Sequence, residues 1–169
     1  MLRRVVIFLM VIAGYILQTT FFKTIALAGV VPNILMIITA SFGFMCGKNE
    51  GMYIGFFAGL LIDIFFGGGF IGFYALVYMV IGYLNGIFNY IFYPEDIKLP
   101  MILIGTSEFF YCFICYVFRF LLRGKLHFNY YFIHIIIPDI VYTILVTLVL
   151  YKGILFVNDR LESREIRRN

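Results

Sequence analysis

Residues 51–63 read GMYIGFFAGLLID, an apolar segment in which a glycine returns at every fourth position until an acid closes the series. Residues four apart lie on one face of an α-helix, so this spacing places Gly51, Gly55, Gly59 and Asp63 on a single stripe. Glycines in such a stripe let two helices approach closely, which is how helices associate in lipid. The segment therefore predicts a membrane helix whose glycine face contacts either another helix of this chain or a helix of a partner protein.

The composition of the whole chain agrees with a membrane location. Of 169 residues, 63% are hydrophobic and 13% are charged, and the mean hydropathy is +1.02. Soluble domains are close to half apolar and a quarter charged, so a chain of this length cannot hide its apolar residues in one small core. The composition predicts an integral membrane protein and excludes a soluble enzyme, a nucleic-acid-binding domain and a secreted disulfide scaffold.

Six apolar runs have about the length of a bilayer-spanning helix, which is about 20 residues. Backbone polar groups in lipid must be satisfied within the segment, so runs of this length are predicted to be helical. We expect an all-α bundle of about six transmembrane helices in a single membrane domain, residues 1–169, with a basic cytoplasmic tail at 152–169 that contacts anionic lipid. The predicted spans are 5–22, 31–47, 51–66, 70–93, 99–122 and 130–151.

The distribution of basic residues predicts the orientation of the bundle, because Lys and Arg concentrate on the cytoplasmic side. If the N-terminus lies inside, nine basic residues are inside and four are outside, so both termini are predicted to be cytoplasmic. The outer four are Lys23, Arg119, Arg123 and Lys125. The inner nine are Arg3, Arg4, Lys48, Lys98, Lys152, Arg160, Arg164, Arg167 and Arg168.

Three acids lie within or beside the spans, where an ionised group is costly and needs a partner. Asp63 falls near the outer end of its helix, which is unfavourable for an anion. It is predicted to form an ion pair with Arg119, Arg123 or Lys23, or to contact another protein. Glu108 lies deepest, as either a proton or ion site or a hydrogen-bonded acid inside the bundle. Asp139 is predicted to stand at a helix start.

Two short segments resemble each other at the starts of spans. Val31-Pro32-Asn33 opens the second span, and Ile137-Pro138-Asp139 lies near the start of the sixth. Proline suits the first turn of a helix, and a neighbouring Asn or Asp can accept from its free N–H groups. If the sixth helix begins at Pro138, residues 130–137 become a segment at the outer surface.

The sequence offers no catalytic, metal or cofactor motif. Cys112 and Cys115 form a C-x-x-C pair, but no second pair and no nearby histidine accompanies them, so they are interpreted as packing residues. No nucleophile stands beside a base in a recognisable arrangement. The sequence therefore predicts a protein that is not an enzyme.

A family resemblance rests on the first half of the chain, from about residue 18 to residue 86. The chain resembles the rod shape-determining protein MreD family of bacteria in its length, its six-span layout and its glycine-to-acid segment. The residues that carry the resemblance are Gln18-Thr19-Thr20, Val31-Pro32-Asn33, Gly43, Gly47, the segment 50–63, Gly72-Phe73-Tyr74 and Gly82-Tyr83.

This resemblance implies a non-enzymatic member of the cell-elongation complex that performs lateral peptidoglycan synthesis in the bacterial cytoplasmic membrane. Its implied partner is the single-span protein MreC, with the cytoskeletal protein MreB, the elongation glycosyltransferase and the transpeptidase nearby. The family is also similar in fold to the substrate-binding S components of energy-coupling vitamin transporters. Glu108 and Asp139 lie outside the resemblance and inherit no role from it.

The similarity in fold raises an alternative function, that of a small-molecule-binding S component. This hypothesis predicts a polar pocket that opens at the outer face. Asn33, Asp63, Arg119 and Asp139 all lie toward that face and are the candidates to line it.

Overall fold

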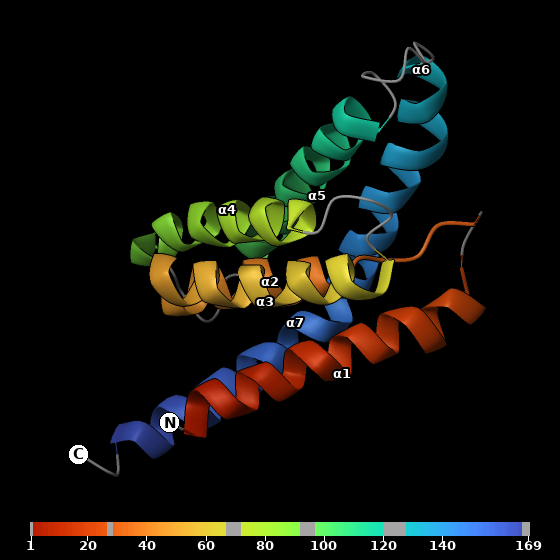
Figure 1. Cartoon of the computed structure of the whole chain (residues 1–169). Helices are drawn as coiled ribbons and strands as arrows, with labels where there is room; N and C mark the ends of the chain where they lie inside the picture. Colours follow the sequence, from red (N-terminus) through yellow and green to blue (C-terminus); the bar gives the residue numbers. More distant parts are fainter. Residues whose placement is uncertain (1, 27–28, 67–71, 92–96, 120–127, 167–169) are drawn as a thin grey trace.

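The computed structural model describes residues 2–26, 29–66, 72–91, 97–119 and 128–166, and every regular element within these ranges is helical (Figure 1). The all-α prediction is therefore confirmed. The elements are α1 (Leu2–Thr24), α2 (Ile34–Cys46), α3 (Lys48–Phe66), α4 (Phe73–Ile87), the 3₁₀ turn η1 (Phe88–Ile91), α5 (Lys98–Arg119), α6 (Phe128–Tyr131), the π-helical segment η3 (Phe132–Ile136) and α7 (Ile137–Ile166).

The described residues include a helix within each of the six predicted spans, but these helices are not equally suited to cross a bilayer. Four helical stretches in the described ranges are long and apolar enough to do so: Arg3–Thr24, Phe73–Ile91, Lys98–Phe118 and Phe132–Arg164. The remaining two are α2, with 13 residues, and α3, which carries Lys48, Glu50 and Asp63. That each of the six crosses the membrane remains a prediction.

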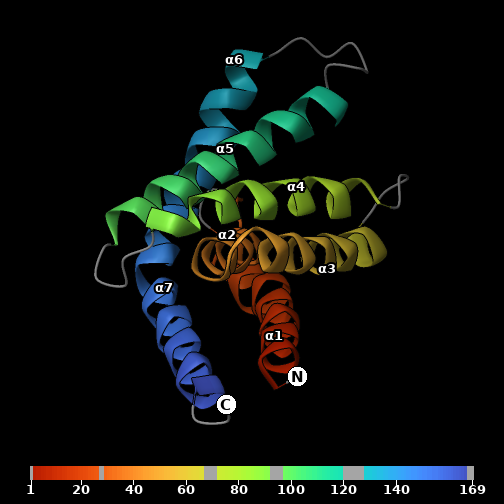
Figure 2. The ribbon, with the colours of Figure 1, turned by 90° about the vertical axis from the view of Figure 1, so that its left-hand side faces the viewer.

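Helix α2 is the centre of the bundle. Every residue from Ile34 to Met45 is buried, as expected of a helix that is apolar all round. Helices α1, α3, α4, α5 and α7 all contact it, and Figure 2 shows α2 enclosed among them. The polar groups at its two ends are therefore held inside the protein.

Helices α2, α3 and α4 come together backbone to backbone. The α2–α3 connection is the single residue Gly47, whose φ of 94° is one that side-chain-bearing residues rarely adopt. Beyond this turn, Gly43, Gly51 and Gly82 meet. A Cβ added to Gly43 would lie 2.7 Å from the Gly82 carbonyl oxygen, and one added to Gly51 would lie 2.6 Å from the Gly43 Cα. Only glycine permits three helices to approach this closely.

The last helix begins before Pro138. Helical structure runs without a break from Phe128 to Ile166, and the Ile137 N–H donates to the carbonyl of Phe132, five residues back. Proline has no N–H and its ring crowds the carbonyl four residues earlier. A π-helical turn just before Pro138 accommodates that defect, so residues 130–137 are part of the helix rather than a separate surface segment.

Both chain termini lie at the same end of the bundle (Figures 1 and 2). Arg3 donates to Cys46 Sγ at 2.9 Å and to Asn158 Oδ1 at 3.4 Å, and Arg4 lies 3.6 Å from Glu50 Oε1. These contacts join the start of α1 to α2, α3 and α7. The segment predicted as a basic tail, 152–169, continues α7 as far as residue 166, and its Leu161 is buried in the core.

Candidate functional site

The N-terminus of α2 is buried, yet each of its first-turn N–H groups has an acceptor. Helix ends leave such groups without partners inside the helix. The N–H groups of residues 34–37 donate in turn to the Pro32 carbonyl, Gln18 Oε1, Asn33 Oδ1 and the Asn33 carbonyl, at 3.1, 3.1, 3.2 and 3.1 Å. Asn33 is thus the helix cap that the sequence predicted, and Gln18 of α1 supplies an acceptor that it did not predict.

Asn33 also links three other helices to the start of α2. Its Nδ2 donates to Glu108 Oε1 of α5 at 3.2 Å, and the hydroxyl of Tyr78 on α4 donates to its Oδ1 at 2.7 Å. Its backbone N–H donates to Thr143 Oγ1 of α7 at 3.1 Å. All four residues are buried, so Asn33 is the centre of a polar cluster inside the bundle.

Glu108, Cys112 and Asp139 continue this cluster toward α7. Cys112 Sγ lies 3.8 Å from Glu108 Oε1 and 3.4 Å from Asp139 Oδ2. One ligand-type atom from each of the three residues lies within 4.8 Å of the others. Glu108 is fully buried, and Glu108 Oε2 and Asp139 Oδ1 are buried atoms with no hydrogen-bond partner.

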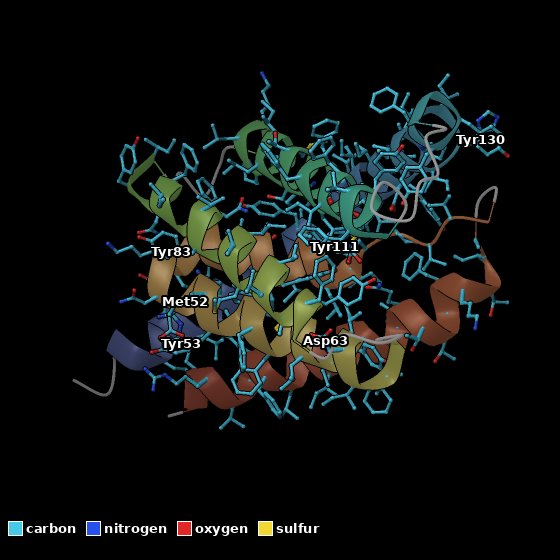
Figure 3. All side chains as sticks on the ribbon, turned by 45° about the horizontal axis from the view of Figure 1, so that its top comes forward. Met52, Tyr53, Asp63, Tyr83, Tyr111 and Tyr130 are labelled. Carbon is cyan, nitrogen blue, oxygen red and sulfur yellow. The ribbon has the colours of Figure 1, made fainter. Side chains whose placement is uncertain are left out.

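Sequence reasoning missed the role of Cys112 in this cluster. The sequence did contain one indication, because Glu108 and Cys112 are four residues apart and therefore lie on the same face of a helix. The approach of Asp139 from α7 could not be read from the sequence, because it depends on how α5 and α7 pack. Tyr111, on α5, borders the cluster with its ring 5.4 Å from that of Tyr78 (Figure 3).

Asp63 binds the N-terminus of α4. Its Oδ1 accepts from the Tyr74 N–H at 3.2 Å and its Oδ2 from the Ala75 N–H at 2.8 Å, where α3 and α4 adjoin (Figure 3). The sequence pointed to an ion pair with Arg119, Arg123 or Lys23. The Arg119 side chain and Arg123 lie outside the described residues, so an ion pair with them stays a prediction. The partners that the structure shows are N–H groups of α4, because the antiparallel neighbour presents the positive end of its helix dipole beside the unfavourable end of α3.

The glycine stripe is covered by α4. A Cβ on Gly51, Gly55 or Gly59 would meet the carbonyl oxygens of Gly82, Tyr78 and Tyr74, respectively. Of the two alternatives that the spacing left open, the structure therefore shows packing within the chain. A partner's helix cannot occupy the same face while α4 is in place.

The residues proposed for a polar outer pocket are only partly brought together. Asn33 and Asp139 belong to the same cluster, whereas Asp63 is engaged at the start of α4. Arg119 ends α5, and its side chain lies outside the described part of the chain. The cluster is packed by direct hydrogen bonds, so these residues add no support to the vitamin-transporter hypothesis.

An apolar groove lies between α4 and α5. The two helices diverge from each other (Figures 1 and 2). The volume of the groove is about 810 Å³. Polar groups occur at Asn85, whose Nδ2 donates to Ser107 Oγ at 2.7 Å and whose buried Oδ1 has no partner. The apolar walls include Leu76, Val80 and Leu84 of α4 and Phe110, Ile114 and Phe118 of α5.

Comparison with known proteins identifies the family. The family model described as rod shape-determining protein MreD matches residues 1–157, which extends past the first half of the chain and includes the whole polar cluster. No curated protein and no solved structure matches the chain, so the similarity to S components remains an expectation. The extent of the family match is decisive, and the chain belongs to the rod shape-determining protein MreD family.

Proposed function

We propose that this chain is a non-enzymatic component of the cell-elongation complex, and that it maintains cell shape by binding MreC and neighbouring wall-synthesis proteins. The observation that carries the proposal is the family match over residues 1–157, which makes the chain a shape-determining membrane protein. Depletion of the chain in its native host is expected to abolish rod or ovoid shape. Unchanged shape after depletion would refute the proposal.

The groove between α4 and α5 is the surface we propose for the membrane helix of MreC. Leu76, Phe110 and Phe118 are 59%, 52% and 55% exposed beside it, so an apolar helix would cover side chains that otherwise face lipid. Asn85 and Ser107, which are joined by a hydrogen bond, also line the groove and supply polar groups there. Polar side chains of this kind strengthen association between helices in lipid.

A bulky substitution in the groove tests the surface without disturbing the core. Leu76→Trp is expected to lower co-purification of MreC about tenfold, which corresponds to about 1.4 kcal/mol. Leu145→Trp on α7 is the matched control, because Leu145 is 53% exposed and is not one of the residues that line the groove. Equal capture of MreC by the two variants would exclude the groove and leave the family function intact.

MreB, the elongation glycosyltransferase and the transpeptidase are proposed as further neighbours, and the chain itself is proposed to lack catalytic activity. Purified protein is expected to leave a lipid-linked wall precursor unchanged in the absence of these proteins. Robust turnover of the precursor by the purified chain alone would contradict this part of the proposal.

We propose that the chain lies in the bacterial inner membrane with both of its termini in the cytoplasm. The basic residues favour this orientation, and the two termini share one end of the bundle. Arg160 and Arg164 are exposed near the end of α7, where Leu161 is buried, so the arginines are proposed to contact anionic lipid headgroups. A C-terminal reporter that is active only in the periplasm would refute the orientation.

A further inference from the structure

Glu108, Cys112 and Asp139 place a thiol between two carboxyl groups inside the bundle. Glu108 and Cys112 project from the same face of α5, and Asp139 approaches from α7. The sulfur lies 3.8 Å from an oxygen of Glu108 and 3.4 Å from an oxygen of Asp139. No ion pair to either acid occurs among the side chains that the structure describes.

Hydrogen bonds alone do not satisfy these three groups. A thiol has one hydrogen, so Cys112 can donate to Glu108 or to Asp139 but not to both. Asn33 donates to one oxygen of Glu108. The other oxygen, Oε2, and Asp139 Oδ1 remain buried without a donor. Unsatisfied buried acceptors are costly, particularly on groups that can ionise, so a positively charged ligand would relieve the cluster.

We propose that Glu108, Cys112 and Asp139 form a binding site for one divalent transition-metal ion of the zinc type. Zinc accepts cysteine sulfur at about 2.3 Å and carboxylate oxygen at about 2.0–2.2 Å in tetrahedral geometry. These bond lengths place sulfur and oxygen ligands about 3.6 Å apart, which lies between the observed separations of the sulfur from Glu108 Oε1 and from Asp139 Oδ2. The unpartnered Oε2 and Oδ1 are the second oxygens of the same two carboxyl groups, so a cation bound there would balance the charge of both groups. The soft thiolate favours zinc over magnesium or calcium.

The surroundings of the three residues fit such a site. Asn33 holds Glu108 by a 3.2 Å hydrogen bond, as outer groups orient the ligands of metal sites. Asp139 is only partly buried, whereas Glu108 is fully buried. Three protein ligands leave the fourth position of a tetrahedral ion for water. Metal binding would also displace the protons of the thiol and the acids.

Cobalt(II) titration of the purified full-length chain in detergent is the decisive experiment. The protein is reduced, treated with a chelator and titrated with Co²⁺, whose thiolate charge-transfer absorption reports a cysteine ligand directly. We expect one Co²⁺ per chain, displaced by Zn²⁺. Cys112→Ser is expected to abolish the absorption and to weaken binding by at least on the order of 100-fold, because loss of a direct ligand costs more than the 10–100-fold that changes to outer-shell residues cost.

Cys115→Ser is the matched control, because Cys115 is also buried on α5 but does not belong to the three-residue group. It is expected to bind Co²⁺ as the unmodified chain does. Each variant is first checked for a monodisperse elution profile and a cooperative thermal transition. If Cys112→Ser does not fold, Asp139→Asn replaces it, with weaker binding but a retained thiolate absorption as the expected result.

Two results would overturn the proposal. One is a folded, reduced, unmodified chain that binds neither Co²⁺ nor Zn²⁺. The other is a Cys112→Ser variant that binds Co²⁺ with the affinity and absorption of the unmodified chain. If Asp139→Asn is used instead, unchanged affinity of that variant would overturn the proposal. Neither result affects the proposed role in cell shape, because that role rests on the family match and is tested by depletion.

Discussion

Gly55→Ala is expected to destabilise the protein through a steric conflict between two helix backbones. A Cβ at Gly55 would meet the carbonyl oxygen of Tyr78 and would lie 2.6 Å from the Tyr78 carbonyl carbon and 3.1 Å from the Met79 Cα. Carbon atoms normally approach to about 3.5–4.0 Å, so α3 and α4 must separate by about 1 Å. Such a gap forfeits a quarter to a half of each contact along the interface, and overpacking costs about 1–3 kcal/mol.

Gly153→Ala isolates this steric cost. Gly153 lies in α7, and a Cβ there would meet nothing within 4 Å. Both substitutions gain the same helix propensity, about 0.5–1 kcal/mol, so their difference measures the clash alone. We expect Gly55→Ala to have a free energy of unfolding about 1–3 kcal/mol lower than Gly153→Ala, measured by reversible unfolding in detergent micelles. Values within about 0.5 kcal/mol of each other would refute the close approach of α3 and α4.

Three further substitutions test single contacts by the same unfolding measurement. Asp63→Asn removes one of two acceptors at the start of α4 and is expected to cost about 1.5–3 kcal/mol; a loss below about 0.5 kcal/mol would contradict the cap. Gln18→Leu leaves the Leu35 N–H without its acceptor, at a cost of about 1–3 kcal/mol, and unchanged stability would show that another group replaces Gln18. Arg4→Gln breaks the pair with Glu50, in which Arg4 is 79% exposed, and is expected to cost about 0–1 kcal/mol; a larger loss would show that the pair is shielded from water.

The positions of the helices could be predicted because they depend on local chemistry. Lipid requires long apolar segments, and such segments are visible in the sequence without knowledge of their neighbours. The cap at Asn33 was also predictable, because a proline and an Asn at a span start act on the adjacent turn. Each of these inferences needs only residues that are close together in the chain.

The partners of the acids could not be predicted, because they come from other helices. Asp63 was judged by the end of its own helix, whereas its partners are N–H groups of the next helix. Asp139 lies 27 positions after Cys112 in the sequence, yet the two side chains are in contact. Hydropathy shows which residues enter the bundle, but the mutual rotation of two helices decides which side chains meet.

The complete enclosure of α2 bears on how the chain enters the membrane. With 13 residues, α2 is about 20 Å long at 1.5 Å per residue, which is less than the hydrocarbon thickness of about 30 Å. A segment of this length is too short to span the membrane as a single helix. The one-residue turn at Gly47 joins α2 directly to α3. The two helices are therefore expected to leave the translocation channel as a hairpin, and α2 reaches its final surroundings only when α5 and α7 have been synthesised and have closed over it.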